Sequence, residues 1–211
     1  MRKNLIIAGL TVWNLILMAA LIFFWMNSRR TPEIDATVNL SSPATKAGSA
    51  PESSALVGEQ NFTYQTGDRL VGEKAPLIVD RHLTLTVTLD AQQERDGVIV
   101  AHGGLAHGYA LYVQDGQLFF VVRRSNALTT VDGGKVTAGR HTLKATLSKT
   151  GELGVALDGK PPVTGQAGGG IAVEPVDGFD VGGDRGAAVG LYPVPNDFGG
   201  TIESVALKTV P

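Results

Sequence analysis

Apolar and polar residues alternate through much of residues 60–211. In residues 82–90 (HLTLTVTLD) the leucines and the valine share one side of an extended chain, and the threonines share the other. This period of two is typical of a half-buried β-strand. Turn signals such as 115–116 (DG) and 132–134 (DGG) separate the runs, so the pattern predicts an antiparallel sandwich or barrel. Further strands are predicted at residues 98–101, 109–114, 117–123, 141–147, 153–157 and 201–208.

One hairpin can be predicted residue by residue. If Asp115 and Gly116 form a two-residue turn, Gln114 pairs with Gln117 and Tyr112 pairs with Phe119. One face of this hairpin is then wholly apolar and belongs to the core. The other face carries Tyr112, Phe119, Gln114 and Gln117, which together could stack on a flat ligand such as a sugar ring. The alternative is a cross-strand aromatic pair shielded by a loop.

The N-terminus contains a long uncharged segment. Residues 5–26 form a run of 22 residues without Asp, Glu, Lys or Arg. A helix of that length spans about 33 Å, enough to cross the hydrocarbon core of a bilayer. We therefore predict a transmembrane signal-anchor at residues 5–27, with residues 1–4 cytoplasmic and the C-terminal domain periplasmic or extracellular. A cleaved signal peptide is the alternative, but the end of the run is bulky (FFWMN) and offers no small-x-small cleavage site.

Residues 28–59 differ from both neighbours in composition. They are rich in Ser, Thr, Ala and Pro and contain no aromatic residue. Such a segment buries too little apolar surface to offset its ordering entropy. We predict a disordered linker here, followed by one folded domain at residues 60–211.

Composition excludes several functions. The chain has no Cys, which rules out disulfides, thiolate nucleophiles and cysteine-ligated metals. The formal net charge is -2, and no basic patch suggests nucleic acid as a partner. No nucleophile triad, phosphate loop or zinc-protease helix is present. A sandwich-fold glycoside hydrolase stays an alternative, although the paired carboxylates that it needs lie on no predicted strand.

Two groups of residues could hold a metal ion. Asp180, Asp184 and Asp197 surround a glycine-rich segment, and carboxylate oxygens suit calcium. Aspartates also cap turns, which is the alternative for these three. His102 and His107 flank a glycine-containing loop, but no third and fourth ligand is evident. We expect no other cofactor.

A set of ordered motifs resembles a known module. In sequence, the segments similar to the C-terminal β-sandwich module of bacterial arylsulfatases are residues 97–104, 108–116, 138–143, 157–160, 181–186 and 198–205. That module is similar to laminin G and concanavalin A-like lectin domains. The resemblance implies an all-β, two-sheet antiparallel jelly-roll sandwich. It does not imply sulfatase activity, because the catalytic domain and its nucleophile motif are absent from this sequence.

These features lead to one functional expectation. We predict a membrane-tethered, extracytoplasmic, non-catalytic recognition module that binds a glycan or a protein partner at the cell envelope. The alternative is an accessory or structural subunit of a sulfatase-like or other envelope enzyme, in which the sandwich packs on another protein.

Overall fold

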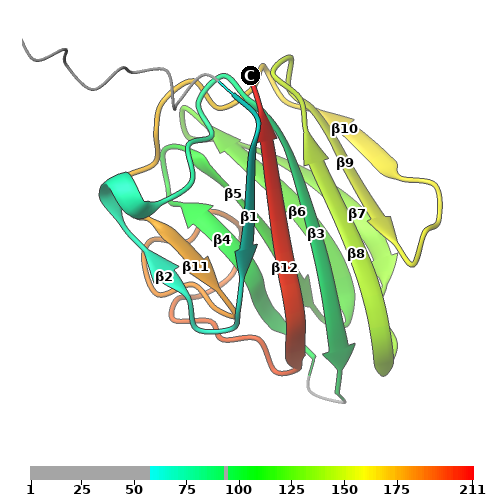
Figure 1. Ribbon diagram of the computed structural model, residues 1–211. Coiled ribbons are helices and arrows are strands. Elements are labelled where there is room, and N and C mark those ends of the chain that lie inside the picture. The colour runs from blue at the N-terminus through cyan, green and yellow to red at the C-terminus, as the bar shows by residue number, and fades with distance from the viewer. Residues whose placement is uncertain (1–57, 93–94) are drawn as a thin grey trace, which may run out of the picture. The chain divides into compact units, whose positions relative to one another are not determined.

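The computed structural model describes residues 58–92 and 95–211, and these residues form an antiparallel sandwich of two six-stranded sheets. Figure 1 shows sheet A, with β12 in red, lying in front of sheet B. In spatial order, sheet A consists of β1 (Gln60–Tyr64), β12 (Thr201–Val210), β3 (His82–Ala91), β8 (Gly139–Leu147), β9 (Glu152–Leu157) and β10 (Val163–Gln166). In spatial order, sheet B consists of β2 (Arg69–Leu70), β11 (Phe179–Val181), β4 (Gly97–Gly103), β5 (Gly108–Gln114), β6 (Gln117–Arg124) and β7 (Ala127–Lys135). The predicted two-sheet antiparallel fold is confirmed.

The main core fills the space between the two sheets. It takes the inward residues of β3, of which Leu85, Val87 and Leu89 are fully buried, together with aromatic residues of sheet B such as Tyr109 and Phe120. Along β3, burial alternates with the period of two that the sequence shows, whereas β4 is buried throughout and β5 is buried at every residue but Gln114.

The predicted β5–β6 hairpin is confirmed at every paired position. Gln114 pairs with Gln117 and Tyr112 pairs with Phe119. Asp115 and Gly116 both have positive φ, at 53° and 70°, as a two-residue turn of type I′ requires. The wholly apolar face lies in the main core, as predicted.

The prediction of a turn at residues 132–134 is wrong. These residues continue β7, and the pairing with β6 shifts between Leu118 and Phe119, so that Gly133 is an extra residue in a β-bulge. A Cβ at Gly133 would lie 2.8 Å from Leu118 Cδ2, which explains why a glycine occupies the bulge. Five strands are absent from the sequence prediction, namely β1, β2, β7, β10 and β11.

A second apolar cluster covers the outer face of sheet B. Residues 188–192 cross this face, and Val189 and Tyr192 pack there against Ala110, Tyr112 and Val121. Sheet B therefore has side-chain cover on both faces, whereas the outer face of sheet A carries threonines and lysines.

The predicted anchor at 5–27 and most of the predicted linker at 28–59 lie outside the described residues. Within residues 58–92 and 95–211, no helix has the length and apolar character needed to cross a membrane.

Candidate ligand-binding groove

The outer face of sheet A carries a ladder of hydroxyl side chains. Antiparallel pairing sets Thr84 of β3 beside Thr146 of β8, which in turn pairs with Gly154 of β9. One row along, Thr86 lies beside Lys144, and Lys144 pairs with Ala156. Residues at these positions point away from the core because their sequence neighbours, such as Leu85 and Leu143, point into it.

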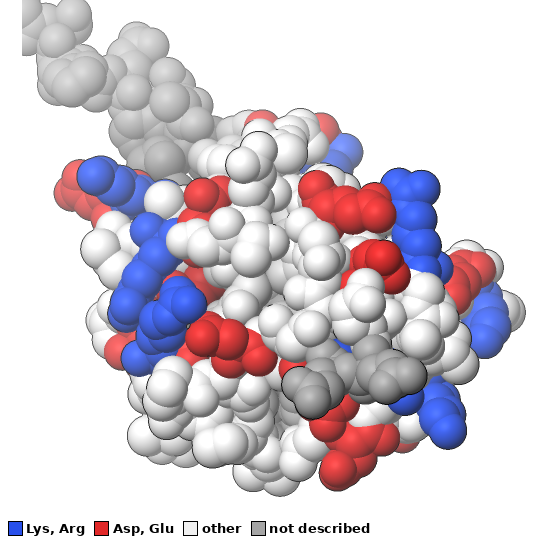
Figure 2. Space-filling view, turned by 90° about the horizontal axis from the view of Figure 1, so that it is seen from below, with Lys and Arg blue, Asp and Glu red and all other residues white. Residues whose placement is uncertain are grey.

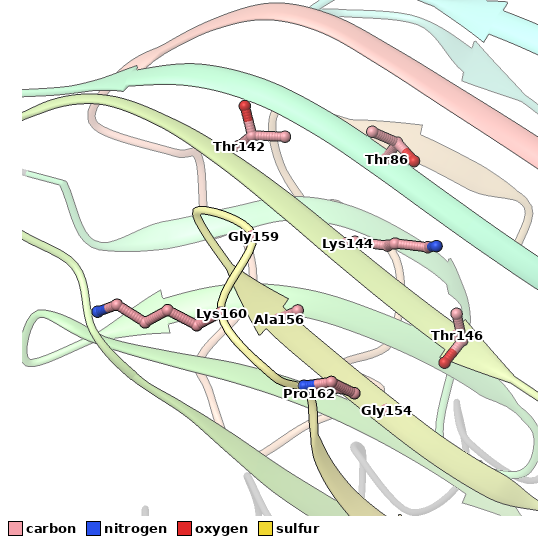
Figure 3. A pocket seen from close by; sticks show the side chains of 9 residues that line it. All are labelled: Thr86, Thr142, Lys144, Thr146, Gly154, Ala156, Gly159, Lys160 and Pro162. Carbon is pink, nitrogen blue, oxygen red and sulfur yellow. The ribbon is translucent and has the colours of Figure 1, made fainter.

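The second of these rows, together with Thr146 and Gly154 of the first, lines a groove of about 390 Å³. Figure 3 shows its lining residues, contributed by β3, β8, β9 and the loop that follows β9. A second depression of about 330 Å³ adjoins it and shares Thr146, Gly154 and Pro162. The residues that line the first depression are Thr86, Thr142, Lys144, Thr146, Gly154, Ala156, Gly159, Lys160 and Pro162.

Small residues keep the groove open. Gly154 is buried beneath its neighbours, and a Cβ at this position would lie 2.8 Å from Thr146 Oγ1 and 3.8 Å from Pro162. Any larger side chain at residue 154 would therefore occupy the region that the two depressions share. Ala156, in the next row, also lines the groove and has the smallest side chain after glycine.

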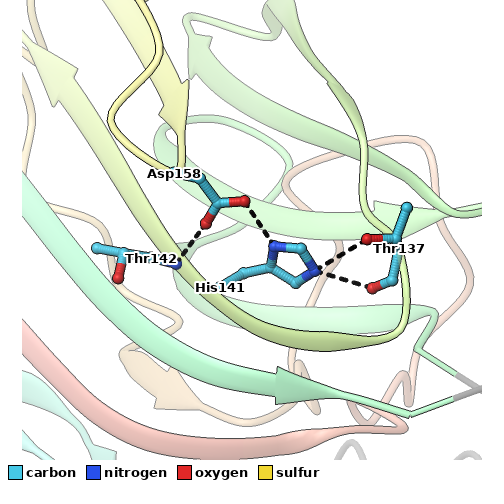
Figure 4. Close-up of polar contacts among 4 residues, drawn as sticks. All are labelled: Thr137, His141, Thr142 and Asp158. Carbon is cyan, nitrogen blue, oxygen red and sulfur yellow. Dashed lines mark hydrogen bonds and ion pairs between the residues drawn. The ribbon is translucent and has the colours of Figure 1, made fainter.

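One wall of the groove is the loop between β9 and β10, which a histidine–carboxylate contact holds in place. His141 Nδ1 lies 2.8 Å from Oδ2 of Asp158, and Asp158 Oδ1 accepts a hydrogen bond of 2.9 Å from the Thr142 N–H (Figure 4). His141 Nε2 lies 2.9 Å from the carbonyl oxygen of Thr137. The strand β8 thereby fixes the turn that carries Gly159 and Lys160.

The same contacts set the charge state of Asp158. Partial burial alone would raise the pKa of this carboxyl group, but the hydrogen bonds from Thr142 and His141 outweigh it and lower the pKa. Asp158 has a φ of 54°, in the left-handed region that Asp tolerates better than most residues. The Asp158 side chain thus stabilises the turn after β9 and joins it to β8.

The predicted aromatic platform lies on the opposite sheet and is covered. The Tyr112 and Phe119 rings lie 5.3 Å apart, and the Tyr192 ring packs on Tyr112 at 4.8 Å. Tyr112 is 3% exposed, and Phe119 is half-buried. Gln114 is exposed at the turn, and Gln117 Nε2 donates a 2.6 Å hydrogen bond to Asp132.

This arrangement corresponds to the shielded pair that we considered as the alternative. Ligand binding by the four residues stays a prediction.

The three aspartates predicted as calcium ligands each have a different partner. Asp184 is 2% exposed and accepts hydrogen bonds from the Tyr192 hydroxyl at 2.8 Å and the Gly186 N–H at 3.0 Å. Asp197 pairs with Arg185 at 2.9 Å, and Asp180 pairs with Arg69 at 3.4 Å. Calcium needs six to eight converging oxygens.

Among the described residues, no group of three or more His, Asp and Glu side chains is arranged to hold a metal ion. Calcium binding by Asp180, Asp184 and Asp197 therefore stays a prediction that the geometry does not favour. Burial raises the pKa of the Asp184 carboxyl group, against the hydrogen bonds from Tyr192 and Gly186.

His102 and His107 lie in different environments. His102 is fully buried against Tyr109 and Phe179, and neither of its ring nitrogens has a hydrogen-bond partner among the residues that the structure describes. Burial lowers the pKa of His102 to about 3. The nearest carboxylate is Glu174, whose Oε1 lies 4.0 Å from His102 Nε2. His107 lines a separate depression of about 220 Å³. The two do not form a metal site together.

Charged side chains of both signs are interspersed on the end of the sandwich seen in Figure 2. Uncharged surface separates them, and no broad patch of one sign occurs on that face. Four cations of the domain are already paired with carboxylates, namely Arg69, Arg140, Arg185 and Lys208.

Comparison with solved structures identifies similar folds. Domains LG4-5 of the mouse laminin alpha1 chain match with a TM-score of 0.53 and 19% identity, over 70% of this chain and 40% of that one. The CBM40 domain of the Ruminococcus gnavus IT-sialidase matches with a TM-score of 0.51 and 16% identity, over 72% of this chain and 91% of that one.

The fold is a laminin G-like sandwich. At these identities the likeness concerns the fold alone. No protein-family model and no curated protein sequence matches the chain.

Sequence reasoning missed the groove but contained a signal for it. The threonines of residues 82–90 were placed on a common polar face, opposite the core. Thr86 pairs with Lys144, and Thr84 pairs with Thr146, which in turn pairs with Gly154, so the groove joins segments about sixty residues apart that only the folded sheet brings together.

Proposed function

We propose that this domain is a non-catalytic glycan-binding module that holds its ligand in the groove on the outer face of sheet A. The groove itself is the observation that carries the proposal. Hydroxyls of Thr86, Thr142 and Thr146 both donate and accept hydrogen bonds, as the hydroxyls of a sugar do. The loop carrying Pro162 gives the groove an apolar wall on which a sugar ring can pack.

The chemistry of the lining favours binding over hydrolysis. None of the nine residues around the larger depression is acidic, and Glu152 is the one carboxylate among those around the smaller. Glycosidases of the usual type need two carboxyl groups flanking the scissile bond. The likeness to the CBM40 domain of a sialidase, whose name marks it as a carbohydrate-binding module, supports the same function.

We also propose that residues 5–27 anchor the domain in a membrane, with residues 1–4 cytoplasmic and the sandwich on the extracytoplasmic side. The support is the uncharged run of 22 residues at positions 5–26 and the Ser/Thr/Ala/Pro-rich segment after it. Alkaline carbonate extraction tests the anchor, because an integral protein stays with the membrane pellet. Protease added to intact spheroplasts tests the orientation by removing the domain.

The glycan-binding proposal is tested with the full-length chain in a neutral detergent on a panel of immobilised glycans. We expect retention on at least one glycan class and loss of retention in Gly154→Val, which fills the groove. Phe119→Ala serves as the comparison, because it alters the aromatic pair on sheet B. Retention lost only in Phe119→Ala would move the site to the pair predicted from sequence, and a blank panel would overturn glycan binding.

A protein partner is the second candidate, because one loop region of the domain exposes apolar side chains. Leu105, Val173 and Val176 are 59%, 53% and 90% exposed, and the two valines line the 220 Å³ depression. An accessory subunit, including one that serves a sulfatase-like enzyme as the motif resemblance suggests, would use such a surface. Cross-linking in intact envelopes, compared between the natural chain and Val176→Asp, distinguishes this function from glycan binding.

A further inference from the structure

Lys144 occupies the middle of the groove between two hydroxyl side chains. It pairs across the sheet with Thr86, and Thr146 lies two residues further along the same strand. In Figure 3 the Lys144 ammonium lies between the side chains of Thr86 and Thr146. An ammonium group with a hydroxyl on either side offers several donors to one ligand group.

Lys144 has no carboxylate within 4.0 Å among the described residues. Two other cations of sheet A differ in this respect, because Arg140 pairs with Glu203 and Lys208 pairs with Glu59. The acidic residue of the adjoining loop, Asp158, is held by His141 and by the Thr142 N–H. The folded domain as a whole is acidic, with 13 Lys and Arg against 16 Asp and Glu in residues 60–211. The positive groove therefore differs in charge from the domain around it.

We propose that the groove selects acidic glycans, and that Lys144 receives a carboxylate or sulfate group of the sugar while Thr86 and Thr146 donate hydrogen bonds to it. This inference rests on the proposed function, because it names the ligand class of the same groove. Charge-assisted hydrogen bonds are stronger than neutral ones, so one such contact separates acidic from neutral sugars.

Lys160 provides a matched control within the same groove. It also lines the depression, but in Figure 3 its side chain extends from the loop away from Lys144. Removing either lysine takes one positive charge from the groove. Only the loss of Lys144 removes the ammonium that lies between the two threonines.

The test uses the full-length chain in neutral detergent and two pairs of probes. One pair is tetragalacturonate and its methyl ester, which isolates the carboxylate. The other is 3′-O-sulfated lactose and lactose, which isolates the sulfate. We expect at least one acidic probe to bind about tenfold more tightly than its neutral partner. Raising NaCl from about 50 to 500 mM should reduce that preference.

Lys144→Gln should bring the acidic-to-neutral ratio close to one, Lys144→Arg should keep most of it, and Lys160→Gln should change it less than threefold. Equal losses in Lys144→Gln and Lys160→Gln would overturn the assignment of the anion to Lys144. Equal binding of acidic and neutral probes would overturn the inference while leaving glycan binding intact. No binding to any probe or to the glycan panel would overturn both. Because Lys144 is exposed, thermal unfolding should be the same in all variants.

Discussion

The Nδ1 atom of His141 lies 2.8 Å from Oδ2 of Asp158, and this contact joins the start of β8 to the turn after β9. The histidine is nearly buried, whereas the carboxylate is 40% exposed. Because the Asp158 carboxylate remains partly in contact with water, forming the contact carries a small desolvation cost. The contact also fixes the position of the loop that follows β9. The loop so fixed is the wall of the groove that contains Gly159, Lys160 and Pro162.

A double-mutant cycle should measure this contact. We expect Asp158→Ala to lower the free energy of unfolding by about 1–2 kcal/mol, because it removes two hydrogen bonds and leaves a residue that tolerates positive φ poorly. The coupling energy between His141→Ala and Asp158→Ala should be about 1 kcal/mol. Asp158→Asn should retain most of the stability, since Asn tolerates positive φ and keeps an acceptor. Additive losses in urea unfolding would show that the two residues act independently.

Gly154→Ala should separate ligand binding from stability. The added methyl group lies 2.8 Å from the Thr146 hydroxyl, which can rotate, and 3.8 Å from Pro162. We expect the free energy of unfolding to change by less than about 1 kcal/mol, and glycan affinity to fall several-fold. Gly168→Ala is the control, because a Cβ there meets no atom of the described residues within 4 Å. Isothermal titration and urea unfolding of both variants check the prediction, and equal affinities would argue that the groove floor takes no part.

His102 should make the domain sensitive to acid. Burial lowers the pKa of this side chain from its ordinary value of 6.5 to about 3. The unfolded state therefore binds the proton more tightly, so the stabilising effect of neutral His102 is complete above pH 6.5 and is lost as the pH falls toward 3. Linkage predicts a loss of about 3 kcal/mol from this residue at pH 4.5.

Two neighbours face His102, and one of them opposes its effect. Burial raises the pKa of Glu174, which stabilises the fold at low pH, and burial also raises the pKa of Tyr109, which does not titrate in this range. We expect a net loss of about 1–3 kcal/mol between pH 7 and pH 4.5. His102→Leu should flatten this dependence, and His82→Gln, which removes an exposed histidine, should not. Parallel curves for all three proteins would contradict the prediction.

Two tyrosine hydroxyls should respond in opposite ways to removal. The Tyr192 hydroxyl donates to the buried Asp184 carboxylate at 2.8 Å, so Tyr192→Phe leaves that oxygen without its partner. We expect a loss of about 1–3 kcal/mol in the free energy of unfolding. Within residues 58–92 and 95–211 the buried Tyr109 hydroxyl has no hydrogen-bond partner, so Tyr109→Phe should be neutral or stabilising. Thermal and urea unfolding of the pair compare the two directly.

Local chemistry made part of the fold predictable. The β5–β6 register follows from Asp115 and Gly116, because a two-residue turn leaves only one pairing for the strands on either side. The same reasoning failed at Gly133, where a glycine-rich stretch marks a bulge within a strand rather than a turn. A bulge and a turn use the same residue types, and only the partner strand distinguishes them.

The candidate groove depended on contacts that no local pattern contains. Thr86 and Lys144 are separated by almost sixty residues in the chain and become neighbours through the β3–β8 pairing. Tyr192 likewise lies far along the chain from Tyr112, in a segment with no strand periodicity, and its cover of the aromatic pair followed from packing alone. The alternation of residues identified the two faces of each strand but not what lies against them.

The loop of residues 188–192 packs on the outer face of sheet B and so makes it different from the outer face of sheet A, which carries threonines and lysines. Substitutions on the outer face of sheet B alter a packed apolar cluster and therefore change the free energy of unfolding of the domain. On the threonine side, a residue such as Lys144 can change in size or charge while the leucines beneath it stay where they are. Substitutions on that side therefore carry a small cost in folding free energy, and if the groove binds glycans as proposed, related chains with altered ligand preferences should differ there first.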